Sequence, residues 1–470
     1  MAIDFLMLGL SLRQVEGVLN LMGQSFGFDA PDHTTVRLWA LRMGLYLWQR
    51  TPPKASDWIW IVDHVAQASG GKCLFIVGVR HSVIQDGNFV LKHTDVALLY
   101  REVMQSCTGD DMFTIFTMLA HRVGLPKQIV SDHGSDVLKG ERLFQAKNTD
   151  VLLTWDMTHR MGRLLLGVQS EDDKWAEFKK HCHRARVKVT RTPWAALSPT
   201  STTSATRCDH FDTLVLWAQK TLARLDGGRI GLIDSTHIWT KRANRSLRKM
   251  LSDADRGSLR ELCRQSFPDA VTFRQAVVSK LGDHEQLDAI VRASDQGRRR
   301  YEKHFGWLES FRERLQTTYV PMVKMTYSAE KQVKHEGMHR ESARQWLSSQ
   351  SALPKSDQHA RKYRARVLRY LRHEGGDHAR NMAVLGTSDV LESLYGKYKR
   401  YTDRGPEATL NSSILILPIA METLSTELIT EAMERASNKS LKGWCVKTFG
   451  RTKLSLQRLL GFAKLASEPA

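Results

Sequence analysis

The stretch WIWIVDHVAQ, residues 58–67, decides the fold of this chain. It is a short run of β-branched and aromatic residues that leads to a single acid, Asp63. A second run of the same kind, KCLFIVGVR (72–80), follows after a loop that contains SGG. Two such runs joined by a short glycine-rich loop predict a β-hairpin. We therefore expect Asp63 to lie near the end of a buried strand.

The residues that follow predict an α/β domain, in which strands alternate with helices. Asp132 comes directly after one apolar strand pattern, and Asp156 ends the next. The segments expected to be helical are HTDVALLYREVMQ (93–105) and GDDMFTIFTMLAHRVG (109–124), and those expected to be strands are KQIVS (127–131) and DVLLTWD (150–156).

The first fifty residues predict a small helical unit. LSLRQVEGVLNLMGQSFG (10–27) has apolar residues at helical spacing, and a second helix follows with Thr34 or Thr35 as its expected cap. Two short helices joined by a turn fit a helix-turn-helix, whose second helix would bring Thr35 and Arg37 to a DNA groove. A helical hairpin that contacts no DNA remains the alternative.

The charge of the chain indicates a polyanionic partner. Its 470 residues include 69 Lys and Arg against 50 Asp and Glu, a formal net charge of +19. A basic protein without a nucleic-acid partner is the alternative. No apolar stretch is long enough for a membrane span, and the N-terminus lacks the features of a signal peptide. We expect a cytoplasmic, nucleoid-associated protein with no membrane partner, or a nuclear one in a eukaryote, with its six scattered cysteines reduced.

Acids at the ends of neighbouring strands suit a metal site. Asp63 and Asp132 would lie side by side and repel each other unless a cation lies between them. Mg²⁺ prefers oxygen ligands, and a carboxylate cluster can hold two such ions. The alternative is that strand-end aspartates cap the next helix or turn, which is the stronger interpretation for Asp136 and Asp156.

Three motifs together carry a family resemblance. IWIVDHVAQ, QIVSDHGSDVLKG and TSDVLESLYGKYK resemble the D, D, E set of RNase H-like transposases, including those of bacterial insertion sequences, and of retroviral integrases. The resemblance implies an RNase H-like mixed sheet with flanking helices. It also implies that Asp63, Asp132 and Glu392 are catalytic and hold two Mg²⁺ ions, with Mn²⁺ as a substitute. Lys399, seven positions after the Glu, would contact a DNA phosphate, as would Lys397.

The sequence also departs from this family pattern. Leu385 and Ser388 stand where the YREK signature of some bacterial transposases has tyrosine and arginine, which puts those DNA contacts in doubt. Glu392 lies 260 positions after Asp132 (392 minus 132), and the intervening patterns are almost entirely helical. Related transposases, including the hAT superfamily, carry a helical insertion at this point. By that resemblance His159 would lie near the metal site and contact DNA; a role in capping its own helix is the alternative.

Basic and aromatic residues alternate in two segments of the insertion, GRRRYEKHFGW (297–307) and ARKYRARVLRYLRHE (360–374). Arginines there would contact phosphates and rings would stack on unpaired bases; the predicted DNA contacts are Arg298, Arg299, Arg300, Arg364 and Arg366. The alternative is that rings at helical spacing pack in a core, as we expect for Trp175, Trp217, Trp307 and Trp346. Cys182 and Cys208 with nearby histidines offer a weaker alternative, a zinc site.

The sequence therefore predicts a metal-dependent enzyme, a DDE transposase that cleaves the ends of an element and transfers the 3′-hydroxyl to target DNA. Its DNA partners would be terminal inverted repeats and target DNA, and the family implies a homodimer or a larger assembly. A resolvase-like nuclease of the same fold and a non-catalytic DNA-binding protein derived from a transposase are the alternatives. The expected parts are an N-terminal DNA-binding unit (1–50), the catalytic domain (51–160), the helical insertion (161–380), the Glu helix (381–404) and a basic helical C-terminal region (405–470).

Overall fold

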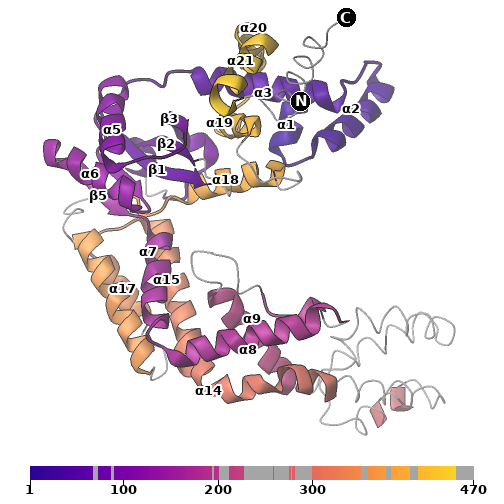
Figure 1. Ribbon diagram of the computed structural model, residues 1–470, viewed down its shortest axis with the longest axis vertical. Coiled ribbons are helices and arrows are strands. Elements are labelled where there is room, and N and C mark those ends of the chain that lie inside the picture. The colour runs from indigo at the N-terminus through magenta and orange to yellow at the C-terminus, as the bar shows by residue number, and fades with distance from the viewer. Residues whose placement is uncertain are drawn as a thin grey trace, which may run out of the picture. The chain divides into compact units, whose positions relative to one another are not determined.

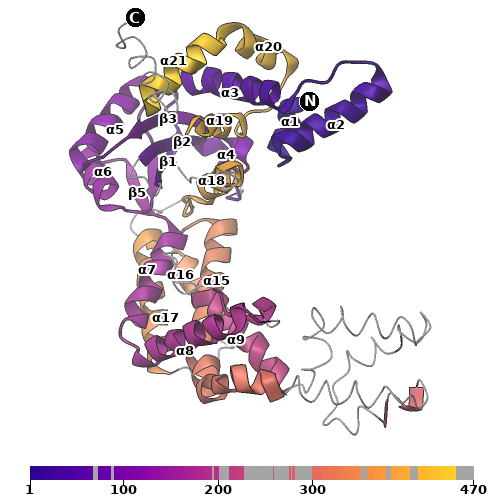
Figure 2. The same ribbon diagram turned by 45° about the vertical axis from the view of Figure 1, so that its right-hand side comes forward.

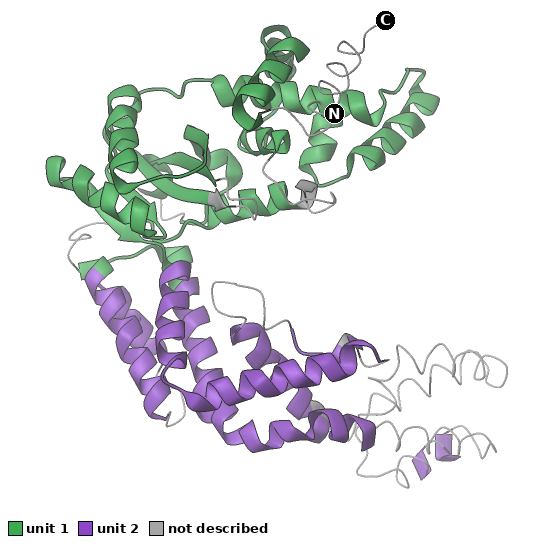
Figure 3. Ribbon diagram, in the orientation of Figure 1, with its two compact units in different colours: residues 1–157, 332–340, 374–470 green, residues 158–331, 341–373 purple. Residues whose placement is uncertain are grey.

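The computed structural model divides the chain into two compact units, which are coloured separately in Figure 3. Unit 1 comprises residues 1–157, 332–340 and 374–470, and unit 2 comprises residues 158–331 and 341–373. The structure describes residues 1–66, 72–85, 89–192, 195–200, 211–226, 258, 275–276, 278–280, 299–350, 357–376, 383–402 and 411–450. Within these residues, no helix combines the length and the apolar composition needed to cross a membrane.

The centre of unit 1 is a five-stranded mixed sheet in the order β3-β2-β1-β4-β5 (Figure 1). β1 pairs antiparallel with β2, and β2 pairs antiparallel with β3. β4 pairs parallel with both β1 and β5. This sheet with its flanking helices is consistent with an RNase H-like fold, as the sequence predicts. The strands are β1 (Trp58–Ala66), β2 (Lys72–Arg80), β3 (Val96–Met104), β4 (Gln128–Ser131) and β5 (Leu152–Trp155).

One predicted helix is wrong. Residues 93–105 form a short 3₁₀ turn, η1 (His93–Asp95), and then the strand β3. β3 pairs with β2 from Lys72↔Met104 to Val79↔Val96, with one irregularity at Ile76/Val77. Its apolar, β-branched and aromatic residues fit a helix or a strand, and the free edge of the hairpin supplies the backbone partners that favour the strand.

The two faces of the sheet build two separate cores. Trp58, Trp60 and Val62 pack on one face with α5 and α6, whereas Ile59 and Ile61 pack on the other with α3, α18 and α19 (Figure 2). This division follows from the alternation of side chains along a strand. The helices are α3 (His33–Gln49), α5 (Gly109–Val123), α6 (Ser135–Lys147), α18 (Asp389–Thr402) and α19 (Ile416–Ile419), with α4 (His81–Gln85) after β2.

The N-terminal helices pack with the C-terminal region of the chain. α2 begins with a capping box of Ser11 and Gln14 and ends at Gly27, whose φ of 72° is left-handed. The cap of α3 is Asp32, whose Oδ1 accepts a hydrogen bond from the Thr35 backbone N–H at 2.7 Å; the expected threonine cap is wrong. Asp32 has the extended backbone that an N-cap requires, directly before the first helical residue. The other elements are α1 (Ala2–Met7), α2 (Leu12–Phe26), η5 (Ser412–Leu415), α20 (Thr426–Arg435) and α21 (Asn438–Phe449).

The elements described in unit 2 are helical. Their core is built from rings: Trp175 contacts Phe211 and Tyr319 at centroid distances of 4.7 and 5.1 Å, and Tyr301 contacts Phe305 at 4.7 Å. Each of these five side chains is buried. The elements, three of which (α7, α15 and α17) include residues of unit 1, are α7 (Met157–Gln169), α8 (Asp173–Thr190), η2 (Ala195–Leu197), α9 (Phe211–Asp226), η3 (Gly306–Phe311), α14 (Arg312–Arg314), η4 (Leu315–Tyr319), α15 (Val320–Glu336), α16 (Ser342–Ser349) and α17 (Gln358–Gly376).

The rings of the two basic segments are therefore core residues. Tyr301, Phe305, Tyr363 and Tyr370 are at most 3% exposed. Their prediction as stacking platforms for bases is wrong, because a ring packed on both faces by other side chains has no surface to offer. The expectation that tryptophans of this region pack in a core is confirmed for Trp175 and Trp346 at 2% and 0% exposure; Trp217 and Trp307 are half-buried against other rings.

A close approach of α3 to η5 yields a stability prediction. A Cβ on Gly44 would lie 2.0 Å from the Leu415 carbonyl oxygen, so backbone has to move to admit it. We expect Gly44→Ala to lower the free energy of unfolding by about 1–3 kcal/mol, measured by denaturant titration. Gly17→Ala in α2 is the control: a Cβ there meets nothing within 4 Å, and the variant should gain about 0.5–1 kcal/mol. Equal effects of the two substitutions would contradict the close approach.

Candidate active site

Asp63 and Asp132 lie next to each other where the parallel pairing of β1 with β4 ends. The expectation that the first strand ends at Asp63 is wrong, because β1 continues to Ala66 through its pairing with β2. The pairing of β1 with β4 runs from Ile59↔Gln128 to Val62↔Ser131, and the two acids occupy the next position on each chain. Asp63 follows Ile61 by two residues, and Asp132 follows Val130 by two. Since Ile61 and Val130 both belong to the core under α18, the period of two assigns both carboxylates to that face.

Helix α18 brings Glu392 to the same face. Leu391, Leu394 and Tyr398 of this helix are buried in the core that contains Ile61 and Val130. The Tyr395 hydroxyl donates a hydrogen bond to the backbone carbonyl of Asp63 at 3.4 Å, which ties the helix to the strand beside the first acid. Glu392 lies in the first turn of α18 and is half-buried.

Asp156 joins β5 to the start of α18. Its Oδ2 accepts hydrogen bonds from the backbone N–H and the hydroxyl of Ser388, at 2.6 and 3.0 Å, across 232 positions of sequence. Asp156 is 0% exposed, and one of its carboxylate oxygens lies within 4.8 Å of one from Glu392. A capping role was the favoured interpretation of Asp156; it accepts hydrogen bonds from Ser388, directly before the helix that carries Glu392.

Leu385 and Ser388, the two residues that depart from the family signature, also hold α18 in place. The Gln128 side chain donates to the Leu385 carbonyl at 2.7 Å, and its Oε1 accepts from the Leu385 N–H at 3.3 Å. Ser388 makes the two hydrogen bonds to Asp156. Where the YREK signature has side chains for DNA, this chain therefore has residues that attach the Glu helix to β4 and β5. Gln128, Leu385 and Ser388 were not predicted as functional, because their partners lie far away in the sequence.

The turn after β4 holds Asp132. Its Oδ1 accepts a hydrogen bond from the Gly134 N–H at 2.8 Å, and His133 between them has a left-handed φ of 53°. The His133 ring stacks on Trp155 at 4.7 Å, and its Nε2 lies 3.6 Å from Oε2 of Glu141. Left-handed backbone is uncommon outside glycine and marks a constrained turn, and the stacking of His133 on Trp155 holds the residue next to the second acid.

The acids do not all lie within reach of a single ion. Asp63, Asp132 and Glu392 are not among the groups of three described ligand residues whose donor atoms all lie within 4.8 Å of one another. A pair of ions spans about 3.5–4 Å by itself, so carboxylates that flank such a pair need a wider separation. The strands and α18 together supply four carboxylates as oxygen donors at one edge of the sheet: Asp63, Asp132, Asp156 and Glu392.

The residues predicted to contact DNA lie in both units. On α18, Lys399 is exposed and Lys397 is half-buried. On α3, Thr35 is half-buried, and the exposed Arg37 donates a hydrogen bond to the Ser412 hydroxyl at 3.4 Å. His159 belongs to unit 2, on α7. Arg299 and Arg300 are exposed, Arg364 and Arg366 half-buried, and Arg366 pairs with Glu171 at 2.9 Å. Arg298 lies outside the described residues, as does Cys208 of the suggested zinc site; Cys182 is buried in unit 2.

The hydrogen bonds between Ser388 and Asp156 predict that loss of the Ser388 hydroxyl destabilises the fold. Ser388→Ala removes one hydrogen bond to a buried carboxylate, and we expect the free energy of unfolding to fall by about 1.5–3 kcal/mol. Ser393→Ala on the exposed side of the same helix is the control, with an expected loss below about 1 kcal/mol. Denaturant titration measures both. A loss at Ser393 as large as that at Ser388 would contradict the role of the buried contact.

Glu141 predicts a pH dependence of stability. Burial raises the pKa of its carboxyl from 4.5 to about 8, so the folded chain keeps a proton that the unfolded chain releases. Stability should therefore fall as pH rises from about 4.5 to about 8, by a few kcal/mol at most. Glu141→Gln should abolish this fall and leave stability near pH 4 almost unchanged. Denaturant titrations across this pH range measure it, and parallel curves for the two proteins would contradict it.

Comparisons with known proteins found similarity among solved structures but no match among family models or curated proteins. Among solved structures, the chain is similar to the Drosophila P element transposase strand transfer complex, with 10% sequence identity over 91% of this chain and 92% of that chain. The TM-score of this match is 0.35.

Proposed function

We propose that this protein is a DDE transposase of an insertion sequence, which cleaves DNA at the ends of an element and joins the 3′-hydroxyl to target DNA. One observation carries the proposal. Asp63 and Asp132 occupy adjacent positions where the parallel pairing of β1 with β4 ends, on the face where α18 carries Glu392. The order of these acids along the chain, and the fold that bears them, are those of the family that the three motifs resemble.

The donor set suits the metal that this chemistry requires. The residues proposed to hold it, Asp63, Asp132 and Glu392, offer only carboxylate oxygens, which are the ligands of a hard cation such as Mg²⁺, with Mn²⁺ as a substitute. When bound, two such ions activate a water or a 3′-hydroxyl and stabilise the leaving oxygen. No nitrogen or sulfur ligand is needed at this edge of the sheet.

The remaining residues of the chain position the acids and the DNA. The Asp156–Ser388 and Gln128–Leu385 hydrogen bonds hold α18 against β4 and β5, so they set where Glu392 lies. Lys399 follows Glu392 by seven residues, nearly two helical turns, so its ammonium lies on the same side of α18. It is exposed and suits a phosphate near the cleaved bond. Asp156 is thus a positioning residue in this proposal.

The net charge of +19 and the exposed arginines support DNA as the partner. Arg299, Arg300 and Arg364 are proposed to contact the backbone of the terminal repeats or the target. Arg366 is a weaker proposal, because it shares Glu171 with Lys362. A homodimer or larger assembly, which would hold two element ends together, and association with the nucleoid complete the proposal.

A strand-transfer assay with pre-cut ends tests the function. Its substrate is a duplex that carries the DNA flanking the gene at its genomic locus, cut to expose a 3′-hydroxyl, with a plasmid as the target. We expect joined products in the presence of Mg²⁺ or Mn²⁺, and a loss of at least about a hundredfold for Asp63→Asn, Asp132→Asn and Glu392→Gln. Glu434→Gln, an exposed acid on α20, is the control and should keep full activity.

The outcomes separate the alternatives. Cleavage without joining, even when a free 3′-hydroxyl is supplied, would favour a resolvase-like nuclease. DNA binding that all three substitutions leave intact, together with no cleavage by the unmodified chain, would favour a non-catalytic DNA-binding protein. Joining that survives Asp63→Asn and Glu392→Gln would refute the assignment of these acids.

A further inference from the structure

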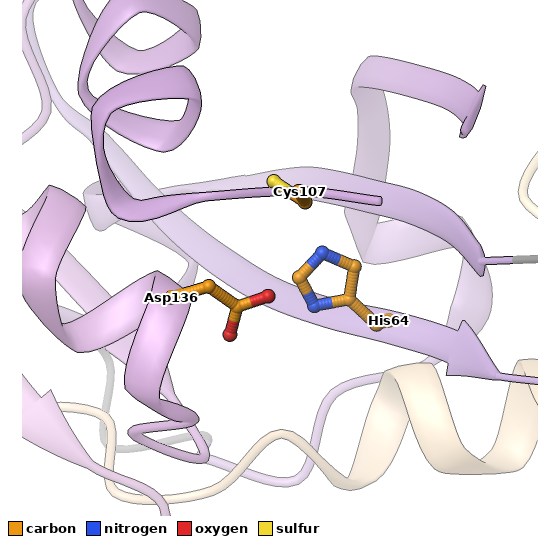
Figure 4. A group of neighbouring side chains, drawn as sticks. All are labelled: His64, Cys107 and Asp136. Carbon is orange, nitrogen blue, oxygen red and sulfur yellow. The ribbon is translucent and has the colours of Figure 1, made fainter. Parts of the chain in front are cut away.

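On the opposite face of the sheet from the four carboxylates lie three side chains of a different chemistry. His64 on β1, Cys107 before α5 and Asp136 in the first turn of α6 each offer one ligand atom, and these three atoms all lie within 4.8 Å of one another. Figure 4 shows the three side chains directed toward a common space from three separate elements. Cys107 packs against the core that contains Trp60 and Val62, which is the core between the sheet and α5 and α6.

The surroundings of His64 point to a missing partner. The Nε2 atom of His64 is buried and has no hydrogen-bond partner among the residues that the structure describes. A buried nitrogen without a partner is costly, and each such atom in a folded protein calls for an explanation.

The identity of the donors selects the class of ion. Thiolate, imidazole and carboxylate together suit Zn²⁺ and similar transition metals, whereas Mg²⁺ takes oxygen ligands. Three protein ligands leave a fourth tetrahedral position for water. The Lys72 ammonium lies 3.4 Å from Oδ2 of Asp136 and would compete with the ion, but it is 40% exposed and can withdraw into solvent.

We propose that His64, Cys107 and Asp136 form a binding site for a transition-metal ion of the Zn²⁺ class, distinct from the carboxylate site on the other face. Binding replaces the thiol proton of Cys107 with the metal, and that proton passes to solvent. The ion would tie β1 to the segment before α5 and to the start of α6. Because α6 begins three residues after Asp132, the site would also restrain the turn that holds the second acid.

Cobalt binding tests the proposal, because Co²⁺ reports its ligands by absorption. The full-length chain, freed of metal with a chelator, should develop a thiolate-to-cobalt charge-transfer band and the visible bands of tetrahedral Co²⁺, which one equivalent of Zn²⁺ should displace. Cys107→Ser should lose the charge-transfer band. The conservative Asp136→Asn should raise the Kd for Co²⁺ by at least about tenfold, since one ligand loses its charge.

Two controls make the result specific. Cys445→Ser, a half-buried thiol on α21, should keep the full spectrum. Glu392→Gln should also keep it, and this variant separates the metal site from the proposed function, since it is expected to lose strand transfer. A charge-transfer band that persists in Cys107→Ser, or tetrahedral bands that are absent from the unmodified chain, would overturn the proposal whatever the DNA assays show.

Discussion

The parallel pairing of β1 with β4, and of β4 with β5, is the constraint on which the candidate site depends. Parallel strands end at the same edge of a sheet, so acids that follow them meet there without any contact of their own. Asp132 and Asp156 lie just beyond the ends of β4 and β5, and Asp63 lies in β1, one position beyond its last residue paired with β4. A shift of one residue in either register would turn the acids of one strand to the opposite core and separate them from α18.

The same alternation gives neighbouring residues in the sequence two different surroundings. Asp63 lies on the face that collects carboxylates from β1, β4, β5 and α18. His64, the next residue, lies on the face with Cys107 and Asp136. Hard oxygen donors and softer nitrogen and sulfur donors are thereby kept apart by the thickness of one strand. An ion that prefers one set has little reason to occupy the other.

Local patterns in the sequence predicted most of the sheet and two of the helices that cover it. The apolar runs that end in Asp63, Asp132 and Asp156 are strands, and α5 ends at Gly124 as expected. The run 96–104 was predicted wrongly because its partner strand, and not its own composition, decides its conformation. The contacts of Asp156 with Ser388 and of Gln128 with Leu385 could not be predicted, since they join residues more than two hundred positions apart and leave no local periodicity. The burial of Glu141 was not predicted, because a glutamate in the middle of a helix usually faces solvent.

Unit 1 is assembled from three separate stretches of the chain, and the last of them begins at residue 374. During synthesis, the five strands leave the ribosome long before α18 does. A nascent chain therefore has Asp63, Asp132 and Asp156 on an apolar face that lacks Glu392 and the leucines of α18 that complete its cover. Completion of the carboxylate set and closure of this core are one event, which occurs only when almost the whole protein has been made. A truncated product would consequently lack the fourth carboxylate and be prone to aggregate through its uncovered apolar face.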